Sequence, residues 1–292
     1  MSADPFVAHR SLLFTVAYEI LGSAADAEDV VQETWLRWAG VDRTEVLHPR
    51  AYLVRIVTRQ ALNRLRTLAR RREDYFGEWL PEPLLISPDV AEDVELAESL
   101  SIAMLTVLET LGPAERAVFV LREVFDTSYD EIAEAVGKTP AAVRQIAHRA
   151  REHVAARRPR MQVTQQEQKA VIDRFLAALQ NGDVQGLLDV LAPDVAMIAD
   201  GGGVVSAARA PIEGAETVAR VLAMFKQRGP EGASTGPMVV NGAPAARIDV
   251  DGVLDTAISF VIEGGRITQI LAMRNPHKLT RLDAESELTR RA

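Results

Sequence analysis

The sequence predicts a multidomain protein in which two all-α domains are followed by an α+β domain. Apolar residues recur at helical spacing through most of the first 158 residues. From about residue 194 onward, short apolar runs alternate with glycine-containing turns, a pattern typical of strands. The 292 residues are enough for two or three domains. We expect helical domains at 1–75 and 95–158, a linker at 76–94 and an α+β domain at 163–292.

The composition is that of a globular protein in a reducing compartment. Hydrophobic residues make up 48% of the chain, and no apolar run reaches the roughly 18 residues that a membrane span requires. The N-terminal residues lack the basic start and apolar stretch of a secretion signal. Cysteine is absent, which excludes disulfides and thiolate metal sites. We expect a cytoplasmic protein with no membrane contact, no metal and no cofactor.

The charge is unevenly distributed, which matters more than its net value of −8. Residues 50–72 contain eight arginines and no acid, and residues 140–160 contain six arginines and one acid. The stretch between them, 73–139, is strongly acidic. Because salt screens charges beyond about 10 Å, binding depends on local potential. Two basic segments therefore predict two contact surfaces for one polyanion.

The first helical domain begins with helices over 5–21 and 24–39, followed by a loop over 40–48. Gly22-Ser23 separates the two helices. The outer face of the second helix is acidic, which favours either solubility or a protein-docking surface. Its exposed positions include Asp29, Gln32 and Glu33.

A third helix is predicted from about Arg50 to Arg72. One face is an apolar stripe, and the other combines arginines with polar and aromatic groups. That combination suits a nucleic-acid strand whose bases are accessible, since stacking contributes about 1–3 kcal/mol per base. The residues on this face are Tyr52, Arg55, Arg59, Asn63 and Arg66, with Gln60 beside them.

The linker contains several prolines and acids, which predicts an extended segment. Its core, WLPEPLL at 79–85, is too apolar for an idle tether, so we expect it to pack against another part of the protein. Helical periodicity returns at 95–111 and again from Pro113 through Phe125.

The second helical domain ends in a predicted helix-turn-helix. Ser128 and Glu131 form a capping box, Gly137 suits the left-handed residue that ends a helix, and Thr139-Pro140 opens the next helix. The second helix is apolar on one face and basic on the other, which suits the DNA major groove. A solvated helical hairpin is the plainer alternative. The groove-facing residues would be Arg144, Gln145, His148 and Arg149.

The α+β domain is predicted to contain helices at 165–180, 183–191 and 215–227. A strand at 194–199 leads into the turn Asp200-Gly201-Gly202-Gly203 and a second strand. Three or four further strands, separated by turns such as Asn241-Gly242 and Asp251-Gly252, complete a curved antiparallel sheet.

An enzymatic function for this domain would need a general acid–base pair in an apolar pocket. The candidates are Asp200, Arg247, Asp255 and His277. The plainer interpretation is that Asp200 belongs to a tight turn and Asp255 faces solvent. We expect no catalytic residues, and a small-molecule ligand for this domain stays open as an alternative.

The first 155 residues resemble the extracytoplasmic-function (ECF) group of bacterial RNA polymerase sigma factors. The resemblance is nearly continuous and implies that 1–75 are the sigma region 2 domain and 95–158 the region 4 domain. It rests on three motifs and their spacing: DAEDVVQETWLRW at 26–38, HPRAYLVRIVTRQALNRLR at 48–66, and LGPAERAVFVLREVFDTSYDEIAEAVGKTPAAVRQIAHRARE at 111–152.

The resemblance implies a role for each polar surface. Asp29, Gln32 and Glu33 would dock on the β′ clamp helices of polymerase, and region 4 would meet the β flap. The 40–48 loop would capture a flipped base of the −10 element. The face with Tyr52, Arg55, Arg59, Asn63 and Arg66 would bind the opened −10 strand, and Arg144, Gln145, His148 and Arg149 would bind the −35 element.

The C-terminal part resembles the SnoaL-like domains, cone-shaped α+β units, and one subgroup of these sigma factors carries such an extension as an attached regulator. The shared motifs are WLPEP at 79–83, DGGG at 200–203 and NPHKL at 275–279. We expect these motifs to dock together and to fix the two sigma domains in one relative arrangement. His277 carries no weight in this motif. The expected contact residues are Trp79, Leu80, Pro81, Asp200, Gly201, Gly202, Gly203, Asn275, Pro276, Lys278 and Leu279.

The sequence therefore predicts a sigma factor that binds core RNA polymerase and promoter DNA, with a regulatory SnoaL-like domain attached. The alternative is a stand-alone DNA-binding regulator whose C-terminal domain senses a small molecule. A third possibility is an isomerase-like enzyme with a DNA-binding appendage.

Overall fold

The computed structural model describes residues 4–72, 75–86, 94–157 and 164–290. The first helical domain is three packed helices, as predicted. Asp4 caps the first helix by accepting from Phe6 N, and Gly22 ends it in the left-handed conformation. Ser23 caps the second helix by accepting from Asp26 N. The elements are α1 (Pro5–Leu21), α2 (Ala24–Ala39), the 3₁₀ turn η1 (Arg43–Glu45) and α3 (Pro49–Arg72).

The second helical domain departs from the predicted pattern at two points. The helix expected over 95–111 is two helices, because Ser101 starts a new one by accepting from Met104 N. The helix expected through Phe125 changes to a π-helix after Phe119. The elements are α5 (Val94–Leu100), α6 (Ile102–Glu109), α7 (Pro113–Phe119), η2 (Val120–Val124), α8 (Tyr129–Val136) and α9 (Pro140–Arg157).

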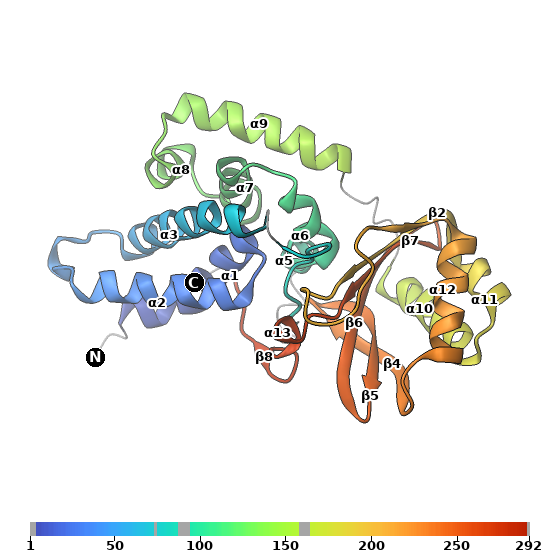
Figure 1. The fold of residues 1–292 in the computed structure, drawn as a ribbon. Coiled ribbons are helices and arrows are strands. Elements are labelled where there is room, and N and C mark those ends of the chain that lie inside the picture. The colour runs from blue at the N-terminus through green and yellow to red at the C-terminus, as the bar shows by residue number, and fades with distance from the viewer. Residues whose placement is uncertain (1–3, 73–74, 87–93, 158–163, 291–292) are drawn as a thin grey trace.

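The two helical domains share one hydrophobic core. Side chains from α1, α2 and α3 pack in the same cluster as side chains from α5 to α9. Figure 1 shows α8 next to α3, with α9 farther from α3 at the top of the view. The two predicted nucleic-acid surfaces, on α3 and α9, are therefore carried on one body in this arrangement.

The C-terminal domain is α+β, built on a six-stranded sheet with the order β3-β2-β7-β6-β5-β4. The prediction of an antiparallel sheet is wrong in one respect, since β2 pairs with β7 in parallel. The second strand expected after the turn at 200–203 is present but short: further turns follow that turn, and the next strand is the two-residue β3. The elements are α10 (Gln165–Asn181), α11 (Val184–Val190), β2 (Leu191–Asp200), β3 (Ile212–Glu213), α12 (Ala215–Arg228), β4 (Ala233–Val240), β5 (Ala243–Val250), β6 (Val253–Glu263), β7 (Arg266–Met273), α13 (Pro276–Leu279) and β8 (Glu285–Ser286).

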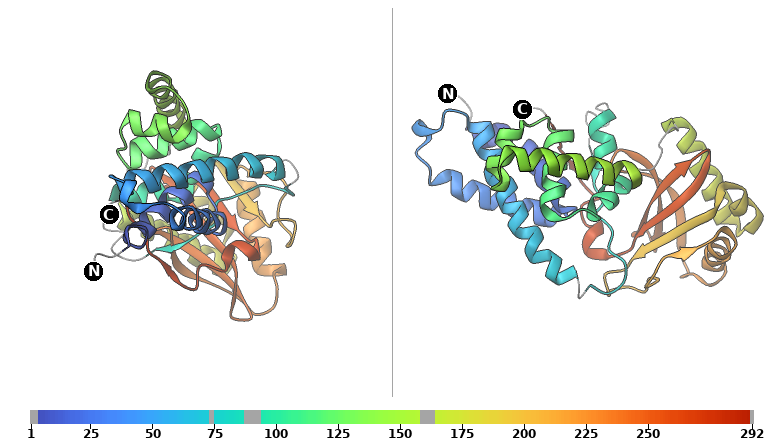
Figure 2. Two further views of the ribbon diagram at one scale, coloured as in Figure 1. Left: turned by 90° about the vertical axis from the view of Figure 1, so that its left-hand side faces the viewer. Right: turned by 90° about the horizontal axis from the view of Figure 1, so that it is seen from above.

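Both faces of this sheet are covered. On one face α10, α11 and α12 close a core in which Phe175 and Phe260 meet edge to face at 5.1 Å. On the other face a second cluster combines sheet residues with Leu80 of the linker, Ile102 of α6 and Leu279 of α13. Figure 2 shows the helical domains and the sheet side by side along the molecule. The linker and α6 are thus part of the packing of the α+β domain.

The C-terminal tail returns to the helical domains. Strand β8 pairs in parallel with β1 (Leu85–Ile86) of the linker. Leu288 is buried in the core of the helical domains, and Thr289 N donates to Thr15 Oγ1 of α1 at 3.0 Å. The sequence analysis did not predict this contact. Among the residues that the structure describes, no helix combines the length and apolar character needed to cross a membrane.

Candidate nucleic-acid interfaces and the interdomain junction

The helix-turn-helix has the predicted local structure. Ser128 and Glu131 form the capping box, Gly137 has a φ of 68°, and Ala142 N donates to Thr139 Oγ1 at 3.3 Å. The inner face of α9 is buried in the shared core. Its outer face is exposed to solvent and carries all four predicted −35 residues, Arg144, Gln145, His148 and Arg149.

An arginine–tyrosine–arginine stack connects the two helices of this motif. The guanidinium of Arg144 lies 5.6 Å from the centre of the Tyr129 ring, and Arg122 lies 4.9 Å from the same ring. Arg122 is itself held by Thr127 O and Asp126 at 3.0 Å each. Cation–π contacts restrict the orientation of Arg144 before any ligand is present.

The predicted −10 surface on α3 is only partly available. Tyr52 is half-buried between Trp38, at 6.0 Å, and the guanidinium of Arg55, at 5.2 Å. Gln60 turns away from this surface: it is buried and donates to Glu33 at 2.8 Å. Asn63 and Arg66 are exposed and hydrogen-bonded to each other at 3.3 Å.

Two arginines of the α3 surface contact the helix-turn-helix. Arg55 forms an ion pair with Glu134 at 3.0 Å. Arg59 donates to the backbone carbonyls of Glu134 and Ala135, at 2.6 and 3.4 Å. These carbonyls lie at the C-terminal end of α8, where the helix dipole attracts a cation. In this arrangement two of the three arginines of the predicted −10 surface contact the domain that carries the predicted −35 surface.

The acidic face of α2 is exposed, as predicted. Asp29, Gln32 and Glu33 all reach solvent. Arg64 of α3 holds Asp29 at 2.9 Å, and Gln60 holds Glu33. The face is therefore presented in a fixed orientation by α3.

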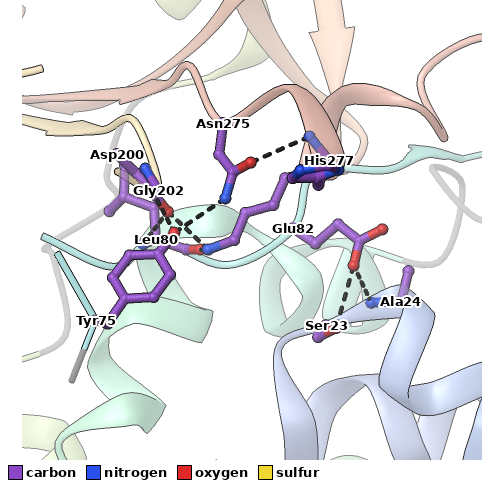
Figure 3. Close-up of polar contacts among 10 residues, drawn as sticks. Ser23, Ala24, Tyr75, Leu80, Glu82, Asp200, Gly202, Asn275 and His277 are labelled. Atoms are coloured by element: carbon purple, nitrogen blue, oxygen red, sulfur yellow. Dashed lines mark hydrogen bonds and ion pairs between the residues drawn. The ribbon is translucent and has the colours of Figure 1, made fainter. Parts of the chain in front are cut away.

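A fully buried carboxylate, Asp200, lies where the linker meets the α+β domain (Figure 3). Its oxygens accept from Tyr75 Oη at 2.7 Å, Leu80 N at 2.9 Å and Gly202 N at 3.0 Å. Lys278 Nζ lies 2.6 Å from Asp200 and also donates to Leu80 O at 2.5 Å. The rings of Trp79 and Tyr75 cover the ammonium, at 4.1 and 5.3 Å. A buried ion pair is tolerated only with such additional hydrogen bonds.

The three glycines after Asp200 are needed because other groups approach the backbone. A Cβ on Gly202 would overlap the side chain of Asn275, and one on Gly201 would overlap Val205 O. Gly203 faces Phe76 of the linker and, like Gly202, has a positive φ. Asn275 donates to Tyr75 Oη at 3.1 Å and caps α13 by accepting from His277 N.

The structure thus brings together most of the three predicted contact motifs. Pro81 is buried, and Leu279 packs on Leu80 in the cluster beneath the sheet. Pro276 and His277 are exposed and play no part in the junction. A regulatory role for these contacts stays a prediction.

Glu82 is a junction residue that the sequence analysis missed. Its carboxylate accepts from Ala24 N at 2.8 Å, Ala25 N at 3.1 Å and Ser23 Oγ at 3.2 Å, so the linker caps α2. Its own backbone N donates to Gly22 O at 2.9 Å. Burial raises the pKa of Glu82, and these donors oppose the shift. The sequence offered one signal, because Glu82 lies inside the apolar linker core that was expected to pack against another part of the protein.

Asn241 is the second missed residue. The Asn241-Gly242 dipeptide predicted a hairpin turn, and the φ of 51° at Asn241 fits that interpretation. Asn241 is also fully buried, and it joins four segments. Its Nδ2 donates to Tyr18 Oη of α1 at 2.8 Å and to Leu100 O of α5 at 2.7 Å, while its Oδ1 accepts from Leu84 N at 2.8 Å.

The four candidate acid–base residues do not form one site. Asp255 of β6 pairs at 3.2 Å with Arg274, the residue directly after β7, and Arg247 pairs with Asp249 on β5. Asp200 is enclosed by the linker, as described above. Asp255 was expected to face solvent; its side chain is 27% exposed, and it is paired with Arg274. Within the described ranges, no three histidine or acidic side chains gather as metal ligands.

Comparison with known proteins agrees with the geometry. Two family models match the chain: Sigma-70 region 2 over residues 6–71 and Sigma-70, region 4 over residues 101–154. The ECF RNA polymerase sigma factor SigJ of Mycobacterium tuberculosis is 36% identical over 96% of this chain and 94% of its own length. The probable ECF RNA polymerase sigma factor SigI of the same organism is 33% identical over 95% and 94%.

A solved structure matches along the whole chain. The crystal structure of M. tuberculosis SigJ superposes with a TM-score of 0.76 at 34% identity, covering 95% of this chain and 98% of that one. The predicted fold class, two helical domains followed by an α+β domain, is confirmed. A stand-alone DNA-binding regulator is not favoured by these relatives. The chain belongs to the ECF sigma factors, which bind core RNA polymerase and direct it to promoters.

Proposed function

We propose that the α+β domain is an attached regulator that holds the two sigma domains in a closed arrangement. The observation that carries this proposal is the direct contact between the two DNA-binding domains, through Arg55 and Arg59 of α3 and the C-terminal end of α8. The linker and the tail connect this closed pair to the α+β domain.

The geometry of a promoter supports the proposal. The −10 and −35 elements lie about 25 base pairs apart, which is about 85 Å at a rise of about 3.4 Å per base pair. In the closed arrangement, Arg55 on the −10 surface lies 3.0 Å from Glu134 in the helix-turn-helix. One molecule in this arrangement cannot occupy both elements, so the two domains must part for initiation.

The contacts differ in strength in a way that suits a switch. The α3–α8 ion pair is solvent-exposed, and such pairs contribute about 0–1 kcal/mol. The Asp200–Lys278 pair and the Asn241 contacts are buried, so their loss is much more expensive. The hydrophobic core that the two helical domains share, together with the junction of the α+β domain, would therefore set the balance between closed and open states more than the exposed ion pair does.

Binding to polymerase would shift the equilibrium toward the open state. We propose that Asp29, Gln32 and Glu33 dock on the β′ clamp helices and that the region 4 domain meets the β flap. The exposure of all three side chains on one face of α2 supports the first contact. A small-molecule ligand of the α+β domain stays a prediction, and the proposed switch does not require one. We propose no catalytic activity for this domain.

The test is run-off transcription with core polymerase. We would compare the full chain, a chain ending at Arg160, and Lys278→Met, which leaves Asp200 buried without its cation. Lys169→Met, at an exposed lysine of α10, is the matched control. We expect Lys278→Met and the truncation to change initiation and Lys169→Met to leave it unchanged. If all four proteins initiate equally, the α+β domain is no regulator.

A further inference from the structure

The closed arrangement buries a carboxylic acid between the two sigma domains. Glu19 of α1 is fully buried and faces α5 and α7 of the second helical domain. Its Oε1 lies 2.8 Å from Ser99 Oγ, and its Oε2 has no hydrogen-bond partner among the described residues. Neither the promoter surfaces nor the junction of the α+β domain uses this group.

The hydrogen-bond geometry indicates which protonation state fits. Ser99 Oγ lies within hydrogen-bond distance of two acceptors, Glu19 Oε1 at 2.8 Å and Leu96 O at 2.9 Å. A hydroxyl has one proton, so it can donate to only one of them. If Glu19 carries a proton on Oε1, it donates to Ser99 Oγ, which then donates to Leu96 O, and every contact in the chain is satisfied.

The surrounding charges favour the same state. Arg116 of α7 is the cation beside Glu19: its Nε donates to the Glu19 backbone O at 2.9 Å, and its Nη1 is paired with Glu109 of α6. Tyr18 and, beyond it, Glu82 of the linker are the other titratable groups nearby. The Nη2 atom of Arg116 and the Oε2 atom of Glu19 are both buried without a hydrogen-bond partner among the described residues, so the two side chains do not form an ion pair in the closed state. An ionised Glu19 would also leave a charged Oε2 unpaired, which is strongly unfavourable.

The pKa values of Glu19 and Arg116 also favour a protonated Glu19 beside a charged Arg116. Burial raises the pKa of Glu19 from its ordinary 4.5 to about 8, against the opposing effects of Ser99 and Arg116. Burial lowers the pKa of Arg116 to about 9, so this guanidinium keeps its charge at neutral pH.

We propose that Glu19 is a proton-binding site at the boundary between the sigma domains, occupied when they pack together and emptied when they part. This inference rests on the proposed closed state. Opening hydrates the carboxyl, breaks its O–H bond and transfers the proton to water or buffer, and closing takes one proton back. The factor therefore couples its activity to pH through a residue that touches neither polymerase nor promoter.

The direction of the pH dependence follows from the difference in Glu19 pKa between the closed and open states. The closed state has the higher pKa and binds more protons, so the Glu19 contribution to closing is fully present below pH 4.5 and is lost as the pH rises through about 8. Between these values the ratio of closed to open molecules falls about tenfold per pH unit. From pH 6.5 to 7.5 the expected fall is about eightfold.

The test measures opening directly in the full chain. The absence of natural cysteine allows two dyes to be attached at Ala8→Cys on α1 and Ala156→Cys on α9, both exposed. Energy transfer is recorded at a sub-saturating concentration of core polymerase, from pH 6 to 8.5. We expect the ratio of closed to open molecules to fall about eightfold between pH 6.5 and 7.5. In Glu19→Gln, a neutral isostere of the protonated acid, the slope should vanish and the closed state should persist at pH 8.5.

Glu216→Gln, at an exposed acid of α12, is the matched control and should keep the wild-type slope. Equal slopes for Glu19→Gln and the wild type would overturn the proton site while leaving the closed state intact. Failure of polymerase to open any of the proteins would instead overturn the proposed function. As a second measurement, the infrared carbonyl band of a protonated carboxylic acid should be present in the wild type at pH 7 and absent from Glu19→Gln.

Discussion

Asn241 offers the sharpest test of how the α+β domain controls the sigma domains. The substitution Asn241→Ala removes three buried hydrogen bonds, to Tyr18 Oη, Leu84 N and Leu100 O, at 2.7–2.8 Å. Leu84 N and Leu100 O are buried and lose this partner, at a cost of about 1–3 kcal/mol each, whereas Tyr18 Oη keeps its hydrogen bond to Glu82 O at 2.7 Å. The closed state should therefore lose about 3 kcal/mol, which corresponds to a factor of about a hundred.

A matched control separates this effect from backbone strain. Asn241 has a positive φ of 51°, where alanine is strained by about 1–2 kcal/mol. Asp251, in another hairpin of the same sheet, has a φ of 53° and is exposed. The substitution Asp251→Ala introduces the same strain without the buried hydrogen bonds.

The assay is the affinity for core polymerase, because under the proposed switch only open molecules bind polymerase. We expect Asn241→Ala to tighten the apparent Kd by up to about a hundredfold and Asp251→Ala to leave it within about twofold. Circular dichroism would check that both variants are folded. Equal affinities for the two variants would refute the argument that Asn241 holds the sigma domains closed.

Three further outcomes are expected. Asp200→Asn should lower the midpoint of thermal unfolding, because it leaves the Lys278 ammonium buried without its counter-ion, and the loss should be about 3–5 kcal/mol; adding Lys278→Met to it should restore part of the loss in the same scan. Gly202→Ala should be destabilising by more than about 1 kcal/mol in urea unfolding, since its Cβ would overlap Asn275 and its φ is +62°. Tyr129→Leu removes the cation–π contact with Arg144, which contributes about 0.5–1 kcal/mol, so it should reduce discrimination between correct and mismatched −35 elements by roughly two- to fivefold in a footprinting titration. Tyr129→Phe keeps the aromatic ring and should keep the wild-type discrimination in the same titration.

The helical part of the fold could be predicted closely because its signals are local. Capping residues and glycines fix the ends of α1, α2, α8 and α9, and apolar periodicity fixes the buried faces. The break at Ser101 was missed because the apolar periodicity continues across it. The parallel pairing of β2 with β7 was missed because strand partners depend on contacts about 70 residues apart, for which the sequence carries no local signal.

The sequence predicted which residues lie on the polar faces of α3 and α9, but not which of them contact another part of the protein. The exposed face of α9 follows from its periodicity, and so does the basic face of α3. That Gln60 turns toward Glu33, and that Arg55 and Arg59 contact α8, depends on how two domains pack. Asn241 shows the same limit, since one Asn-Gly dipeptide specifies a hairpin turn and says nothing of what lies against it.

The pairing of β8 with β1 has a consequence for the synthesis of the protein. Glu285 lies 200 positions after its partner Leu85 (285 − 85 = 200), so a ribosome adding about 5–20 residues per second needs about 10–40 s to supply the second strand. In the later part of that interval, once Arg157 at the end of α9 has been added, both sigma domains have been synthesised, while the tail that packs Leu288 into their core does not yet exist. Each new molecule therefore passes through a period in which its promoter-binding domains are complete and their C-terminal restraint is still being made.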